Sequence, residues 1–233
     1  MNRVPTFTYD EALHYLDQKE WGSLGIADKV GVLQAVEKEM ASRQSREASM
    51  VKPKEFELLQ AGEYDPHTNE IFINSNLLNH EKYGADPNTH LVTVLHEGRH
   101  SYQTQVVAGK TNHHNQEDID LWTQNLSAGN YISGRENYPR YYNQPVEKDA
   151  RSYSQEMQRQ IQQEREKLIN RENMMHESKQ AFKAQMAGTE EHATSDSMSK
   201  DIFIQQQQDE HLDCDIKNNE ATQARLKDRE RKR

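Results

Sequence analysis

The feature that most constrains this chain is the pentapeptide His96-Glu97-Gly98-Arg99-His100. In an α-helix its two histidines lie one turn apart on the same side, so both imidazoles can bind one Zn²⁺ ion. Glu97 lies beside them, where its carboxylate can act as a general base. The pattern therefore requires a helix with one side open to a metal site and the opposite side buried against a core.

The residues around the pentapeptide predict such a helix. Asp86-Pro87-Asn88-Thr89 is typical of a helix start, with an aspartate cap and a proline in the first turn, and Gly109 suits its end. At about 100° per residue, the apolar side carries Leu91, Val94, Leu95, Gly98, Tyr102 and Val106. The opposite side carries Thr93, His96, Glu97, His100 and Thr104. Gly98 costs about 1 kcal/mol relative to alanine, and we expect a close backbone approach there.

The remaining segments predict an α+β fold that is mostly helical. Helices are expected over about residues 10–20 and 28–45, and Lys52-Pro53-Lys54 ends the helical pattern. Two extended segments, 56–64 and 70–74, flank the turn-rich Asp65-Pro66-His67-Thr68-Asn69 and predict a hairpin or small antiparallel sheet. After the metal-site helix we expect a loop-rich insert over 109–144, with one short helix around 116–126, and then a long helix from Pro145.

Two parts of different composition are expected within the 233 residues. Residues 1–155 carry the motifs and the strands and are predicted to form the catalytic domain. Residues 156–233 are predicted to form a polar helical extension that is partly disordered, because the chain is almost wholly polar from about Lys183. Only 33% of all residues are hydrophobic, which agrees with a modest core and a long solvated part.

Charge and cysteine content limit the partners and the compartment. The 38 acidic and 29 basic residues give a net charge of -9, which disfavours general binding to nucleic acid or anionic membranes. The single Cys214 excludes an intrachain disulfide and zinc sites that need several cysteines. The sequence has no apolar signal segment and no run of roughly 18 apolar residues. We therefore expect a soluble protein of a reducing compartment, either the bacterial cytoplasm or a target cell reached without a signal peptide.

A catalytic zinc ion needs a third protein ligand and keeps one position for water. Gln103 and Val106 stand where HExxHxxGxxH has its glycine and third histidine, which argues against the metzincin class. The better candidate is Glu147, in Gln144-Pro145-Val146-Glu147-Lys148-Asp149-Ala150, because the first turn of a long helix would hold its side chain rigidly. Competitors on the intervening insert are His113, His114, Asp118 and Asp120.

The segments His96 to Gln103 and Gln144 to Ala150 together resemble the metallopeptidase domains of bacterial effectors and polymorphic toxins, of the gluzincin type of zinc peptidase. The resemblance covers about residues 28–155. It implies that an edge strand before the metal-site helix binds the substrate, here Ile71, Phe72, Ile73 and Asn74. Many gluzincins have an aspartate four residues after the ligand glutamate, bonded to a zinc-bound histidine. Arg151 occupies that place here, and Asp149 is the alternative candidate.

The function expected from this resemblance is that of a zinc-dependent endopeptidase acting on a protein substrate. His96, His100 and Glu147 would bind Zn²⁺, and Glu97 would take a proton from the attacking water and pass it to the leaving amine. Candidates for the donor that stabilises the oxyanion are Tyr138, Tyr141, Tyr142, His113 and His114. Two other functions stay open: a zinc hydrolase of peptidoglycan cross-links or a non-peptide amide, and a binding protein in which the HExxH pattern is incidental.

Overall fold

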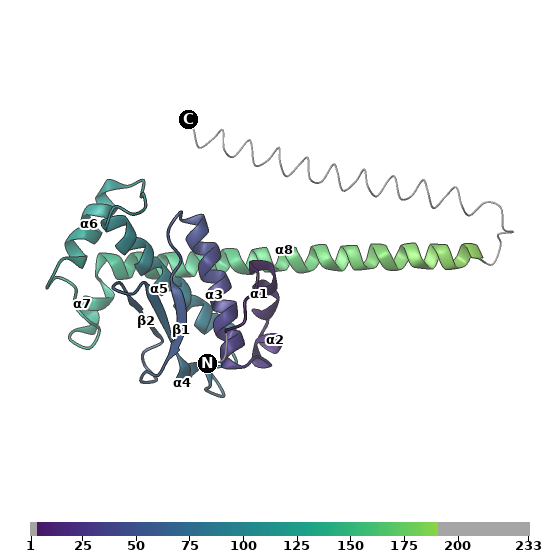
Figure 1. Ribbon diagram of the computed structural model, residues 1–233, viewed down its shortest axis with the longest axis horizontal. Helices are drawn as coiled ribbons and strands as arrows, with labels where there is room; N and C mark the ends of the chain where they lie inside the picture. The colour runs from purple at the N-terminus through teal and green to yellow at the C-terminus, as the bar shows by residue number, and fades with distance from the viewer. Residues whose placement is uncertain (1–3, 191–233) are drawn as a thin grey trace. The chain divides into compact units, whose positions relative to one another are not determined.

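The computed structural model describes residues 4–190 and divides the chain into two compact units, Met1–Glu172 and Asn173–Arg233. The elements are α1 (Tyr9–Tyr15), α2 (Gln18–Gly22), α3 (Ile26–Arg43), β1 (Met50–Lys54), β2 (Gly62–Asp65), β3 (Glu70–Asn74), α4 (Ser75–Leu78), α5 (Pro87–Val107), α6 (Gln116–Leu126), α7 (Tyr138–Tyr142) and α8 (Pro145–Glu190) (Figure 1). A mostly helical α+β fold is therefore confirmed. Within the described range, no helix is long and apolar enough to cross a membrane.

The sheet has three strands in the order β1-β3-β2. Strands β2 and β3 are antiparallel and flank the predicted turn, in which the Asp65 carboxylate accepts the backbone N–H of His67 at 2.8 Å. Asn69 completes the turn with a φ of 53°, a left-handed conformation that asparagine tolerates. The predicted antiparallel pair is therefore present, and the turn chemistry sets its register.

Strand β1 makes the sheet mixed, whereas a purely antiparallel sheet was expected. It runs parallel to β3, with Pro53 opposite Ile73. A proline cannot donate to a neighbouring strand, so it is tolerated here because β1 lies at the edge of the sheet. The Gln34 side chain of α3 covers that edge, accepting from the Val51 N–H at 2.8 Å and donating to the Ser49 carbonyl at 3.0 Å.

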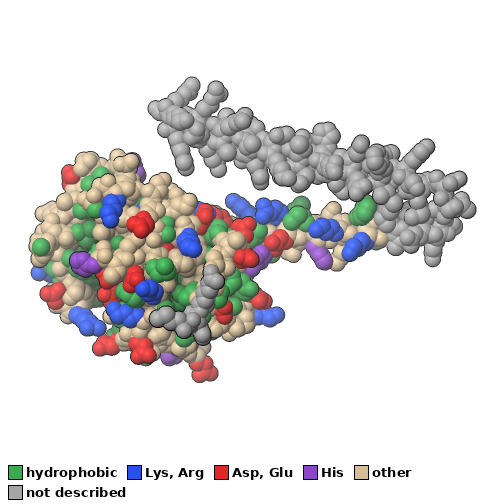
Figure 2. Space-filling model, viewed as in Figure 1, with side chains coloured by type: hydrophobic (Ala, Val, Ile, Leu, Met, Phe, Trp, Pro, Cys, Tyr) green, Lys and Arg blue, Asp and Glu red, His purple; other side chains and the backbone are tan. Residues whose placement is uncertain are grey.

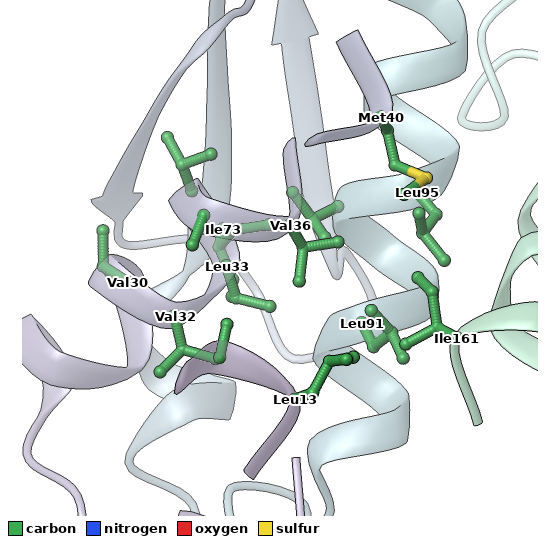
Figure 3. Packing of buried hydrophobic residues seen from close by; sticks show 14 of the residues in the cluster. Leu13, Val30, Val32, Leu33, Val36, Met40, Ile73, Leu91, Leu95 and Ile161 are labelled. Carbon is green, nitrogen blue, oxygen red and sulfur yellow. The ribbon is translucent and has the colours of Figure 1, made fainter. Parts of the chain in front are cut away.

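The main core joins α1, α3, α5, the sheet and α8. Figure 3 shows side chains from these elements converging in one cluster. Ile161 and Leu168 of α8 belong to it, with Ile161 only 1% exposed. The first compact unit consequently extends to Glu172, beyond the boundary at residue 155 expected from composition.

The second unit is described only over residues 173–190, which continue α8. Three apolar side chains, those of Met174, Met175 and Phe182, are exposed there among charged residues (Figure 2). These residues are part of the predicted polar helical extension. The rest of that extension, residues 191–233, lies outside the described residues.

A buried ion pair supports the back of α5. Arg46 donates two hydrogen bonds to Glu37, at 2.6 and 2.8 Å, and both side chains are almost fully buried. Gly98 lies directly against this pair, because a Cβ atom added there would be 2.7 Å from Glu37 Oε2. The expected close approach at Gly98 is therefore confirmed, and the neighbour is a side-chain carboxylate.

We predict that Ile161→Ala lowers the free energy of unfolding by about 2–5 kcal/mol, because it removes a fully buried side chain from the main core. Met174→Ala, on the same helix but 70% exposed, should change it by less than about 0.5 kcal/mol. Urea denaturation followed by circular dichroism measures both. Equal effects of the two substitutions would show that residues 156–172 do not belong to the first unit's core.

We also predict that Gly98→Ala destabilises the protein by about 1–3 kcal/mol, despite alanine's better helix propensity, because the Glu37 carboxylate cannot move without breaking its buried ion pair. Gly22→Ala is the matched control, since a Cβ at Gly22 meets nothing within 4 Å. Thermal denaturation of both variants tests the difference. A Gly98→Ala protein as stable as the wild type would mean that the approach is looser than described.

Candidate metal centre

Helix α5 presents His96, Glu97 and His100 from the side opposite its buried face. The Asp86 carboxylate caps its first turn, and a proline occupies the first helical position. The buried side of the helix carries Leu91, Val94 and Leu95. The three pentapeptide side chains are partly exposed, as predicted for the open side, but Thr93, which was also expected there, is buried.

The first turn of α8 positions Glu147. Just before this helix, the Gln144 side chain pairs with both backbone polar groups of Ile132, at 2.8 and 2.9 Å. Gln144 also accepts from the side-chain amide of Asn125 at 3.0 Å, and Asn125 accepts the Val146 N–H at 3.3 Å. These contacts fasten the start of α8 to α6 and to the insert, and they bury Glu147 completely.

Three ligand atoms converge where α5 and α8 meet. The Nε2 atoms of His96 and His100 lie 3.1 Å apart. Each lies 3.3 Å from one carboxylate oxygen of Glu147. The three residues are close enough to bind one metal ion, with all their ligand atoms within 4.8 Å of one another. The predicted convergence of Glu147 with the two histidines is thus confirmed.

The local geometry and donor chemistry fit a divalent transition metal. A tetrahedral ion with ligand distances of about 2 Å separates its ligand atoms by roughly 3.3 Å. The two Nε2 atoms are 3.1 Å apart, and each is 3.3 Å from a different Glu147 oxygen, Oε2 for His96 and Oε1 for His100. Glu147 Oε2 is buried, and its near neighbour His96 Nε2, at 3.3 Å, does not make a well-formed hydrogen bond with it, so a cation between them would satisfy this oxygen. Two imidazoles and one carboxylate are the ligand types of catalytic zinc sites, which keep a fourth position for water.

The electrostatics of the site favour a bound cation and a basic Glu97. Burial lowers the pKa of His100, but its contacts with Glu147 raise it overall to about 9. Burial works to raise the pKa of Glu147, yet the two histidines hold it well below its usual range. Burial also raises the pKa of Glu97, and the histidines only partly offset this effect. Glu97 is therefore a stronger base than an exposed glutamate.

The residue that orients His100 is Gln103. In the sequence it was noted only because it stands where the HExxHxxGxxH pattern has its glycine. Its Oε1 lies 2.8 Å from His100 Nδ1. Asp149, the expected partner, hydrogen-bonds instead with Gln103 and Arg99. Arg151 stacks on the Tyr142 ring at 3.6 Å and does not replace an aspartate. The signal for Gln103 was its position three residues after His100, on the same side of the helix.

Two tyrosines interact with Glu147: Tyr131, which is not among the expected donors, and Tyr141, which is. Tyr131 donates its hydroxyl hydrogen to Glu147 Oε1 at 2.8 Å. Tyr141, which was expected, lies beside it with 6.4 Å between ring centroids. Burial and the Glu147 carboxylate raise the pKa of both hydroxyls, so both stay protonated donors. Tyr138 and Tyr142 of α7 are exposed, and their rings are tilted against each other with centroids 6.0 Å apart.

The competing residues of the insert form a separate cluster. His113 hydrogen-bonds with the Tyr102 hydroxyl at 3.0 Å and with the Asp118 carboxylate at 3.1 Å. The His114 ring packs on that of His113, and Asp120 accepts from Gln116. None of these side chains belongs to the ligand group identified among the described residues. Their contacts hold the loop before α6 against α5.

The expected substrate-binding strand, Ile71 to Asn74, lies at the centre of the sheet. Strand β3 pairs with β1 on one side and β2 on the other, so its backbone offers no free edge. The prediction that it is an edge strand is therefore wrong. Two buried isoleucines, Ile71 and Ile73, favour the central place. The edge nearest the metal centre is β2, where a Cβ atom added to Gly62 would lie 3.5 Å from Glu97 Cγ.

Comparisons of the chain with protein families, with curated protein sequences and with solved structures found no match.

We predict that the purified protein binds about one Zn²⁺ per chain and that Glu147→Gln weakens this binding by more than about 100-fold, because even groups that only orient a ligand contribute about 10–100-fold. Asp118→Asn, at a competing carboxylate, should leave the affinity unchanged. Competition with a chromophoric chelator measures both. Equal losses in the two variants would exclude Glu147 as the specific ligand.

Removing the metal should also lower the Tm of the wild type, since the ion binds only the folded site.

Proposed function

We propose that this protein is a zinc-dependent endopeptidase, of the kind found in bacterial effectors and toxins. The observation that carries the proposal is the convergence of two histidines and a buried glutamate with a second glutamate beside them. Sets of two histidines and one glutamate are typical of zinc peptidases. The resemblance at His96 to Gln103 and at Gln144 to Ala150 supports the same assignment.

The proposed roles follow from where each side chain lies. His96, His100 and Glu147 would hold a zinc ion, which would supply Lewis acidity and the activation of a water molecule near neutral pH. Glu97 takes the proton from that water and returns it to the leaving amine, a role that suits its raised pKa. Tyr131 donates its only hydroxyl hydrogen to Glu147 Oε1 and would hold that ligand, so Tyr141, beside it, is the proposed donor to the developing oxyanion.

A protein substrate is proposed to bind as an extended strand along β2. In the described part of the chain β2 pairs only with β3, which leaves its other edge for a substrate backbone. Gly62 allows this strand to approach Glu97 closely. Substrate binding at β2 replaces the binding at Ile71 to Asn74 expected from the resemblance.

The decisive variant is Glu97→Gln, which keeps the size of the side chain but removes its basicity. We expect it to retain zinc and stability while losing about 10²–10⁴-fold in peptide hydrolysis, the usual contribution of a general base. Glu166→Gln, an exposed change on α8, is the control and should keep full activity. The measurement is a comparison of protein termini in a proteome treated with each zinc-loaded protein.

New amino termini specific to the wild type and the control would give both the reaction and the substrate. Full proteolysis by Glu97→Gln contradicts the proposed role of Glu97. Zinc binding without new termini contradicts the peptidase proposal. It favours instead a hydrolase of peptidoglycan or of a non-peptide amide, and release of fragments from purified peptidoglycan tests the first of these. Failure to bind zinc favours a binding protein instead.

A further inference from the structure

We propose that Gln103 is a positioning residue that fixes the orientation of the His100 ring and its distance from Glu147. Asp149, which is itself held by Arg99, fixes the Gln103 amide. This inference rests on the metal centre of the proposed function but not on the reaction catalysed there. Gln103 belongs to α5, one turn after His100, and is fully buried between the two helices that supply the ligands.

The hydrogen bonds of Gln103 fix the direction of its amide. Its Nε2 donates to the Val146 carbonyl at 2.9 Å and to Asp149 Oδ2 at 2.6 Å. Because both partners only accept, the opposite end of the amide must be the oxygen, and this oxygen lies 2.8 Å from His100 Nδ1. The ring must then donate from Nδ1, which leaves the lone pair of Nε2 directed at the metal centre.

The same side chain sets the position of α8 relative to α5. It contacts a ligand histidine on α5 and, through Val146, the peptide group that leads into Glu147 on α8. A shift of either helix along its axis would lengthen one of these two bonds. Gln103 therefore couples the orientation of His100 to the separation between His100 and Glu147.

Arg99 and Asp149 form an ion pair that fixes the Gln103 amide. Arg99 donates two hydrogen bonds to Asp149, at 2.7 and 2.9 Å, in the bidentate geometry that fixes both groups. The guanidinium also lies over three aromatic rings, those of Tyr102, Tyr153 and Trp122, at 4.5, 4.8 and 5.3 Å. Arg99 Nε and Gln103 Nε2 donate to the same oxygen, Asp149 Oδ2, so the carboxylate that Arg99 fixes can orient the amide.

This arrangement accounts for the missing aspartate at position 151. The neutral amide oxygen of Gln103 accepts the hydrogen bond from His100. The negatively charged Asp149 contacts the other end of this amide and does not touch the imidazole. The imidazole is oriented as a carboxylate would orient it, but it receives less additional electron density.

The chain supplies a matched control for testing Gln103. Gln105 is a second buried glutamine on α5, but its amide faces away from the metal and donates to Glu47 and Ser101. We expect Gln103→Met to weaken Zn²⁺ binding by about 10–100-fold, the usual contribution of a group that orients a metal ligand. Gln105→Met should lose stability without losing intrinsic zinc affinity.

Two further readouts separate positioning from general loss of packing. The visible spectrum of the Co²⁺-loaded protein should change in Gln103→Met and stay as in the wild type in Gln105→Met. In the zinc-loaded wild type, the Nδ1–H proton of His100 should give a slowly exchanging NMR signal with contacts to Gln103, which tests the bond even if a variant fails to fold.

Equal zinc affinities and cobalt spectra for the two methionine variants would overturn the proposal, as would absence of the His100 proton signal. None of these measurements uses proteolysis. Loss of zinc affinity confined to Gln103→Met, in a protein that cleaves no peptide bond, would support the role of Gln103 and refute the proposed reaction.

Discussion

The structure depends on the compensation of one buried charge, the carboxylate of Glu147. An ionised carboxylate removed from water is unstable unless positive charge lies close to it. Without a metal, a proton on His100 supplies that charge, which is why contacts with Glu147 raise the pKa of His100 to about 9 despite its burial. A divalent cation supplies more charge at the same place, and its binding releases the proton. Metal binding, histidine protonation and the packing of α5 against α8 are therefore linked.

Two apolar clusters hold the ligand-bearing helices at this separation. The main core joins the first half of α5 to α8 through residues such as Leu91 and Ile161. A second cluster joins the end of α5 to α6 and to the first turn of α8, and it contains Tyr102, Val106, Trp122 and Val146. Ligands carried by helices that pack at both ends have little freedom to shift. The insert thus completes the metal centre by packing around it, although the direct ligands come from α5 and α8.

Features that depend on residues close together in the sequence could be predicted, and features that depend on contacts between distant residues could not. The cap at Asp86, the apolar period of α5 and the glycine at Gly98 all lie within one helix, and they predicted its two faces correctly. Strand β1 was missed because Pro53 is a local sign of interruption, whereas its tolerance at a sheet edge depends on pairing with distant β3. Tyr131 carried no signal, since its contact with Glu147 depends on the path of the whole insert.

The central place of β3 links the fold to the chemistry proposed for the site. Its isoleucines are buried and take the middle of the sheet, which leaves the more polar β2 at the edge facing α5. At Gly62 the backbone of β2 comes so close to α5 that a Cβ atom would lie 2.6 Å from the Thr93 side chain. The absence of a side chain at this position is what lets β2 pack closely against α5 beside Thr93 and Glu97. The glutamate proposed as general base and the strand proposed to bind the substrate are thus neighbours because of how the sheet packs on α5.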